Sequence, residues 1–230
     1  PGQITKILPC PDLFFSMQCT DACVFPYPGG DSSLRRMALS ARELGFDSIV
    51  AACPANGTYC GVEVIGMKVM GRAGAGAKEV SHAEPGQEGR AITVAHAGEY
   101  AANRALLRTG KIMILRGIQW TPKNSFDHIL SRMAAERGIA VDIDFSSLIC
   151  ERGSSRQRVI QRYADIVRLH RKFGFSLTLS SGARSVLGMR SPREMTVLGG
   201  LFGLEEDDTG RALGTVRQLL FPRSPVEVVE

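Results

Sequence analysis

The chain has 230 residues, of which 44% are hydrophobic and 22% charged, and its formal net charge is +5. These values are typical of one globular domain spanning residues 1–230, and they exclude a disordered polymer, a fibrous repeat and a pair of large domains. No apolar run approaches the ~20 residues that cross a bilayer, and the start of the chain lacks the pattern of a secretory signal. We therefore expect a soluble, cytoplasmic protein that has no contact with a membrane.

Apolar, β-branched runs alternate with helical patterns along most of the chain. With an early strand near residues 6–15, the predicted strands are 46–52, 61–70, 91–97, 111–118, 139–145 and 175–181. The predicted helices are 32–44, 99–108, 125–137, 154–173, 192–201 and 205–220, the first four ending at or just before a glycine. This alternation predicts parallel strands with right-handed crossovers. About seven strands in this length predict an α/β fold, an irregular TIM-like (β/α) barrel, with a doubly wound open sheet as the alternative.

A glycine-rich segment and the cysteines are the features that could indicate a cofactor or a metal, and both signals are weak. The glycine-rich segment 71–89 has no apolar period and predicts a long loop. It lacks the ending of a P-loop and the spacing of a dinucleotide-binding turn, which disfavours nucleotide binding. The six cysteines form no CxxC pair, so we expect free thiols rather than a zinc site or disulfides.

Positive charge is concentrated in residues 150–193, which hold ten basic and two acidic residues. On an ideal helical wheel, several of these cations share the face of 154–173 that lies opposite its apolar residues. They are Arg158, Arg162, Arg168, Arg171 and Lys172. Asp165 is the one acid of this helix, so the like charges favour a polyanionic partner. A solvated polar face is an equally good interpretation.

Residues that follow the strands are the candidates for function, because a parallel barrel builds its site from these loops. They are rich in cations and poor in metal ligands, and they include His96, Arg116, Lys123, Asp144 and Arg184. Asp142 and Asp144 alternate along one strand and therefore share a face. We expect them to form hydrogen bonds or to pair with arginine inside the barrel.

The strongest signal is the stretch 177–208. In it a strand ends in two serines, turns at Gly182 and exposes Arg184, and Pro192 then opens a helix between two arginines. The sequence LSSGARSVLGMRSPREMTVLGGLFGL, with segments 125–149 and 159–174, resembles the protein component 3 family of ribonuclease P. That family is the barrel-shaped protein subunit of the archaeal and eukaryotic enzymes.

The resemblance implies a barrel related to the polymerase and histidinol phosphatase superfamily. Those relatives begin with a DLHxH motif, and we match it to residues 12–16, where Phe14 and Ser16 replace the two histidines. The resemblance therefore implies that the metal site is dismantled, that this chain binds no cofactor, and that Mg²⁺ belongs to the RNA. It also implies a function as a subunit that binds and stabilises the RNA that removes the 5′ leader of precursor tRNA. The implied partners are the ribonuclease P RNA, precursor tRNA through the holoenzyme, a small ferredoxin-like subunit and other ribonuclease P proteins.

Six cations are our candidates for RNA contact: Arg72, Arg116, Lys123, Arg184, Arg190 and Arg193. Arg184 and Arg190 come from the segment that carries the resemblance, and the others from loop position and charge. A buried ion pair with Asp142 or Asp144 is the alternative for Arg116. Packing at a helix start is the alternative for Arg190.

The competing function is a metal-dependent phosphoesterase or amidohydrolase on the same barrel. It predicts that His82, His96 and nearby carboxylates converge on a metal ion. A third interpretation, a barrel enzyme acting on a sugar phosphate, requires a tight anion pocket at the strand ends.

Overall fold

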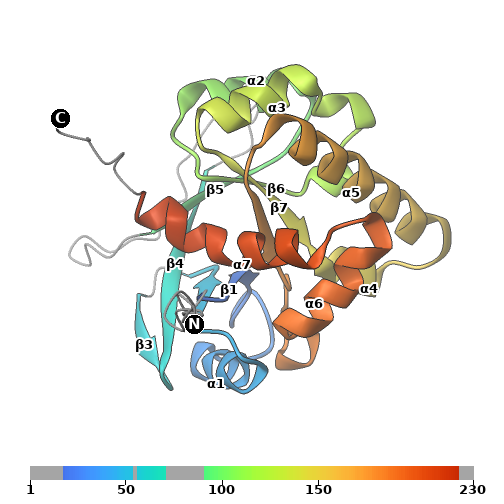
Figure 1. Ribbon diagram of the computed structural model, residues 1–230. Helices are drawn as coiled ribbons and strands as arrows, with labels where there is room; N and C mark the ends of the chain where they lie inside the picture. Colours follow the sequence, from blue (N-terminus) through green and yellow to red (C-terminus); the bar gives the residue numbers. More distant parts are fainter. Residues whose placement is uncertain (1–17, 54–55, 71–90, 223–230) are drawn as a thin grey trace, which may run out of the picture.

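The computed structural model describes residues 18–53, 56–70 and 91–222, which form a parallel barrel wrapped by helices (Figure 1). Its strands are β1 (Thr20–Val24), β2 (Ser48–Ala51), β3 (Gly57–Tyr59), β4 (Val62–Met70), β5 (Ile92–His96), β6 (Ile114–Arg116), β7 (Ala140–Asp144) and β8 (Leu177–Ser180). The hydrogen-bonded order is β1-β2-β4-β5-β6-β7-β8, parallel throughout, and β3 pairs antiparallel with β4.

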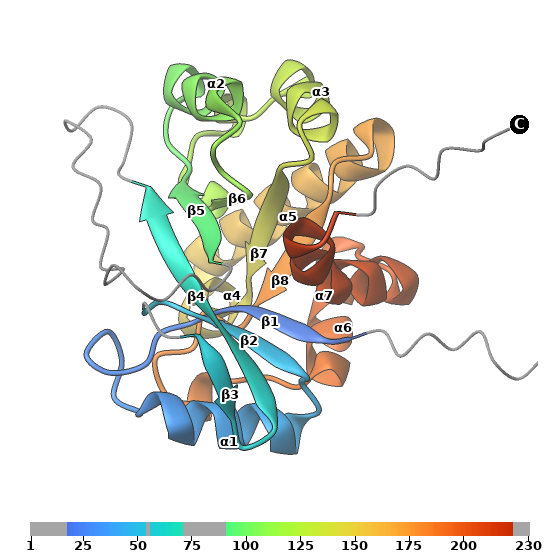
Figure 2. The same ribbon diagram turned by 90° about the vertical axis from the view of Figure 1, so that its left-hand side faces the viewer.

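The sheet closes on itself where β8 returns to β1. Val24 and Ala183 form a parallel bridge, and the backbone N–H of Phe25 donates to the carbonyl of Ala183 at 2.7 Å. The N–H of Gly182 donates to the carbonyl of Cys23 at 3.0 Å. The long strand β4 supports the opposite side, since its first half pairs with β2 and its second half with β5 (Figure 2). The predicted barrel is therefore confirmed, and the open sheet is wrong.

Helices cover the outside of the strands (Figures 1 and 2). They are α1 (Leu34–Leu44), α2 (Tyr100–Thr109), α3 (His128–Glu136), α4 (Phe145–Cys150), α5 (Gly153–Phe173), α6 (Pro192–Gly199) and α7 (Glu206–Leu220), with short 3₁₀ turns η1 (Ile118–Trp120), η2 (Lys123–Ser125), η3 (Val186–Gly188) and η4 (Gly200–Phe202). Helix α6 begins as the sequence predicts, with Pro192 in its first turn and a capping box between Ser191 and Glu194.

The alternation of side chains along the strands divides the barrel interior into two layers. On β6, Ile114 and Arg116 share one face, and on β7 Ala140 shares its face with Asp142 and Asp144. Ile114 and Ala140 belong to a small apolar cluster of strand residues and α7 residues. The charged residues that follow them on the same faces are Arg116, Asp142 and Asp144. They lie toward the carboxyl ends of the strands, which form the functional end of such a barrel.

Three elements differ from the sequence-based expectations. The expected strand near residues 6–15 and the loop 71–89 lie outside the described residues. Strand β1 was missed because its sequence, TDACV, is short and carries an aspartate instead of a β-branched run. Strand β3 and helix α4 were missed as well, since segments of three and six residues carry no measurable period.

The turn at Gly182 gives a test of the closure. Gly182 has φ of +59°, and an added Cβ would lie 2.2 Å from Oδ1 of Asp144. We expect Gly182→Ala to lower the free energy of unfolding by roughly 2–5 kcal/mol, through backbone strain and overpacking. In the control Gly214→Ala, within α7, an added Cβ meets nothing within 4 Å, and we expect a gain of up to about 1 kcal/mol. Urea denaturation measures both, and equal effects would contradict this account.

Candidate nucleic-acid interface

The carboxyl end of the barrel holds a buried ion-pair network centred on Arg116. This side chain is 4% exposed, and its Nε donates to Oδ2 of Asp142 at 3.0 Å. Its Nη2 donates to Oδ2 of Asp144 at 2.7 Å, and its Nη1 contacts the sulfur of Cys23 at 2.5 Å. The three donor groups of the guanidinium are therefore all used inside the barrel.

Neighbouring hydroxyls supply the remaining hydrogen bonds of the two carboxylates. Thr178 and Ser180 donate to Asp142 at 3.1 and 2.8 Å, and Ser146 donates to Asp144 through its N–H and its hydroxyl. Burial raises the pKa of Asp142 to about 6, although Arg116 opposes this shift by favouring the charged form. A buried ion pair with this many partners is strongly coupled to the fold.

The residues at the barrel mouth do not fit a divalent metal ion. Within residues 18–53, 56–70 and 91–222, no group of three or more His, Cys, Asp and Glu side chains is arranged to hold one. The two carboxylates of β7 that face the mouth are already paired with a guanidinium. His96 is exposed, and His82 lies outside the described residues, so the convergence expected for a phosphoesterase is not seen in the part of the barrel that the structure describes.

The structure shows a second segment of the chain that can be aligned with the DLHxH motif. Residues 12–16 lie outside the described residues. The described barrel begins with β1, whose end has the same spacing from Asp21 to Phe25. There Cys23 and Phe25 stand where the motif has its histidines. Neither location therefore supplies the histidine pair.

Arg116 is a correction to the predicted RNA contacts. Its guanidinium is buried and bound to Asp142 and Asp144, so the ion-pair alternative is the correct one. Arg72 lies outside the described residues, and its role stays a prediction.

Arg184 is exposed at the rim of the barrel, on the loop after β8. Its guanidinium lies 4.6 Å from the centre of the Phe25 ring, and its Nη1 donates to the carbonyl of Gly29 at 2.6 Å. The same ring lies 5.0 Å from the guanidinium of Arg116. Phe25 therefore contacts one buried and one exposed arginine, and each of these cation–π contacts is favourable.

Arg190 and Arg193 flank the start of α6 and differ in exposure. Arg190 is half-buried, and its Nη1 donates to the carbonyls of Leu187 and Met189 at 3.0 and 2.6 Å. This is the helix-start packing that we gave as its alternative, and its RNA contact stays a prediction. Arg193 is exposed in the first turn of α6.

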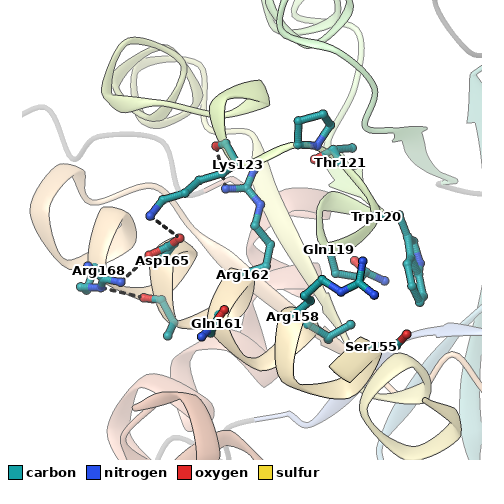
Figure 3. Close-up of a pocket in the computed structure, with 13 residues that line it drawn as sticks. Gln119, Trp120, Thr121, Lys123, Ser155, Arg158, Gln161, Arg162, Asp165 and Arg168 are labelled. Atoms are coloured by element: carbon teal, nitrogen blue, oxygen red, sulfur yellow. Dashed lines mark hydrogen bonds and ion pairs between the residues drawn. The ribbon is translucent and has the colours of Figure 1, made fainter. Parts of the chain in front are cut away.

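Lys123 lies on the loop after β6, at the edge of a groove formed by that loop and by α5 (Figure 3). Its side chain is 81% exposed, and its Nζ lies 3.3 Å from Oδ2 of Asp165. The same carboxylate pairs with Arg168. Lys123 and Arg168 therefore share one negative charge and leave excess positive charge at this edge.

Two cations assigned to the open face of α5 have other roles. Arg162 is buried, and it donates to the carbonyls of Ile118 and Lys123 and to the hydroxyl of Ser125. Arg171 pairs with Glu205 at 2.8 Å and with Asp208 at 3.3 Å. The expected lack of compensating acids is therefore wrong for Arg171, because the acids come from a distant part of the chain.

Sequence reasoning did not single out Trp120, a residue of the groove at the loop after β6. Trp120 is 60% exposed, and it lies beside Gln119 and Arg158 (Figure 3). The available signal was the single tryptophan of the chain, placed just after a strand and next to a glutamine.

No helix in the described ranges has the length and apolar character that crossing a membrane requires.

Comparison with known proteins adds a family and a fold. A family model described as RNase P subunit p30 matches residues 18–223. The chain is similar to ribonuclease P protein component 3 of Methanosarcina acetivorans, with 29% identity over 219 residues and 89% of each chain covered. It is also 36% identical to the protein of that name from Methanococcoides burtonii over 123 residues, which cover 53% of this chain and 51% of that protein.

Two solved structures share the fold. One is a chain of archaeal ribonuclease P with mature tRNA, with a TM-score of 0.67, 15% identity, and 87% of this chain and 89% of that chain covered. The other is a prolidase bound to a phosphonate derivative of proline, with a TM-score of 0.52, 11% identity, and 88% and 73% covered. At these identities the likeness concerns the barrel itself.

Removing the buried cation of Arg116 should destabilise the fold. We expect Arg116→Met to lower the free energy of unfolding by about 3–5 kcal/mol, because it leaves the buried Asp142 and the partly buried Asp144 without their counter-charge. The control Arg193→Met removes an exposed arginine and should change stability by less than about 0.5 kcal/mol. A loss below about 1 kcal/mol for Arg116→Met, measured by urea denaturation, would count against the network.

The stability of the chain should also depend on the pH through Asp21. Burial raises the pKa of Asp21 from 3.8 to about 7, against hydrogen bonds from Ser181 and Cys23 that favour the charged form. The folded chain keeps this proton where the unfolded chain has lost it, so Asp21 stabilises the fold at low pH, and this contribution falls as the pH rises from 3.8 to about 7.

Asp21→Asn keeps the shape of the side chain and removes the titration. We expect the dependence of unfolding free energy on pH in this window to become less negative by up to about 1.4 kcal/mol per pH unit. Urea denaturation at several pH values measures it, and an unchanged slope would show that Asp21 is charged in the folded chain.

Proposed function

The chain belongs to the RNase P subunit p30 family, and we propose that it is the barrel-shaped protein subunit of a ribonuclease P. In this proposal it binds and stabilises the catalytic RNA domain, and the RNA removes the 5′ leader of precursor tRNA. The family match over residues 18–223 is the observation that carries the proposal. The similarity to the archaeal protein component 3 sequences supports it.

We propose further that the isolated chain is not catalytic and that the catalytic Mg²⁺ is bound by the RNA component. The barrel mouth supports this division of roles, because Arg116 supplies the positive charge that the carboxylates of β7 require. Among the described residues, such a mouth offers no group of ligands that could hold a metal ion and activate a water molecule.

The contribution of the protein is then electrostatic. Exposed cations at the rim, above all Arg184 and Lys123, neutralise closely spaced phosphates and release counterions, which favours a compact RNA at lower magnesium concentration. Arg184 follows β8 and Lys123 follows β6, with β7 between these strands in the sheet. The rim can therefore contact the backbone at two separated points, and such contacts position an RNA without reading its sequence.

The proposed partners are the ribonuclease P RNA, precursor tRNA through the holoenzyme, the small ferredoxin-like subunit and other ribonuclease P proteins. The family membership supports this set as a whole. A cytoplasmic location stays a prediction.

Reconstitution tests the function directly. The full chain is mixed with the catalytic RNA and the other protein subunits, and cleavage of precursor tRNA is followed as magnesium is lowered. We expect the chain to reduce the magnesium concentration that cleavage requires, and we expect the chain without RNA to cleave nothing. Cleavage that is identical with and without the chain at every magnesium concentration would refute the proposal.

The double variant Lys123→Gln with Arg184→Gln sharpens this test. We expect the slope of log affinity against log salt to become shallower by about one unit per lost phosphate contact, with affinity falling similarly for different RNA sequences. Arg104→Gln, which removes one exposed charge from the outer helix α2, serves as the control and should leave the slope unchanged. A slope that is the same in the double variant and the control would exclude these contacts.

A further inference from the structure

A groove of about 750 Å³ lies between the loop after β6 and α5, which lines it from Ser155 to Arg168 (Figure 3). Arg162 fixes its geometry, since the buried guanidinium ties α5 to the carbonyls of Ile118 and Lys123 on that loop. The groove therefore has a rigid floor, made of one helix and one pinned loop.

Trp120 forms one end of this groove. It is the single tryptophan of the chain, and 60% of its surface is exposed. A turn at Gly117, which has φ of +78°, holds it there, and the N–H of Trp120 donates to the carbonyl of Gly117 at 3.2 Å. Trp120 also lines a second hollow of about 330 Å³, together with His96. A large aromatic ring fixed in an exposed position is suited to stacking on a planar partner.

Gln119 adds an unsatisfied polar group next to this ring. The residue is 8% exposed, it lines the same groove, and its Oε1 has no hydrogen-bond partner among the described residues. A buried acceptor left without a hydrogen bond is destabilising, because it has lost its contact with water and gained no partner. The side-chain amide of Gln119 can rotate toward the groove without breaking a hydrogen bond of its Oε1. An amino group of a ligand could then donate a hydrogen bond to this oxygen.

The charge of the groove favours an anion. Four cations line it, and one carboxylate, that of Asp165, is shared by Lys123 and Arg168 at the far end. Arg158 lies at the same end as Trp120 and Gln119 (Figure 3), and it forms no ion pair with any acid in the described residues. Its guanidinium is therefore free to meet a phosphate.

We propose that this groove binds one unpaired nucleotide of an RNA. The base stacks on Trp120, its exocyclic amino group pairs with the amide of Gln119, and Arg158 contacts the adjoining phosphate. The nucleotide must be unpaired, because the faces of bases inside a duplex are covered by their neighbours. Glutamine pairs well with adenine, which makes adenine the expected base. The inference rests on the proposed function to the extent that it takes the ligand to be RNA.

The fluorescence of Trp120 provides a direct test, because no other tryptophan contributes. The full chain is titrated with an oligoadenylate octamer and, separately, with an octamer of the same backbone that lacks bases. We expect the oligoadenylate to quench the fluorescence at saturation and the abasic octamer to leave it nearly unchanged. Quenching by both probes, or by neither, would overturn the proposal.

Variants separate stacking from charge, with affinity measured by the anisotropy of labelled oligoadenylate. We expect Trp120→Leu to weaken binding roughly 5- to 150-fold without changing the salt slope, and Trp120→Phe to keep most of the affinity. We expect Arg158→Gln to lower the salt slope by about 0.7. Gln119→Leu should reduce the preference for oligoadenylate over oligouridylate, and Arg104→Gln again serves as the control. Thermal unfolding shows that each variant is folded.

This design distinguishes failure of the inference from failure of the proposed function. If the catalytic RNA binds the full chain while Trp120 fluorescence is unchanged and Trp120→Leu binds as the parent does, the groove is not a nucleotide site and the proposed function stands. If the fluorescence changes only on addition of another protein subunit, the groove is a protein interface and the inference is overturned. Binding of oligoadenylate through Trp120 without binding of the catalytic RNA would support the groove and contradict the function.

Discussion

The buried contact between Arg116 and the two carboxylates of β7 is the interaction on which the rest of the structure depends. Strand alternation places Asp142 and Asp144 on one face of β7, inside the barrel, and burial raises the pKa of Asp142. A cation must be present, and the neighbouring strand β6 supplies it as a guanidinium. The guanidinium of Arg116 therefore balances the charge of the two carboxylates, and these three side chains fill the mouth of the barrel.

Because the residues of the mouth are paired with one another, the exposed cations that we propose to meet RNA lie at the rim. The ring of Phe25 contacts both the buried Arg116 and the exposed Arg184. At the loop after β6, the buried Arg162 donates to the carbonyls of Ile118 and Lys123, and the exposed Trp120 lies on the same loop. In both places a buried arginine contacts the ring or the loop that supports an exposed residue proposed to meet RNA.

The basic helix α5 shows why charge on a sequence is not the same as charge on a surface. Arg162 is buried in hydrogen bonds to the neighbouring loop, and Arg171 is paired with Glu205 and Asp208 at the start of α7. Arg158 keeps its charge available to the groove. The cations of this helix therefore differ in how much of their charge the surface presents.

The sequence by itself predicted the alternation of strands and helices, most helix positions and the inward pairing of Asp142 and Asp144, because these follow from residue periods of two and 3.6 within short segments. It identified Arg184 through a local motif. The contacts between β8 and β1 decided for a barrel over an open sheet. Only the tertiary structure decided the burial of Arg116 and Arg162, the neutralisation of Arg171 and the grouping of Trp120 with Arg158. Those outcomes depend on side chains tens of residues apart, whose meeting is set by how strands and helices pack and not by any local period.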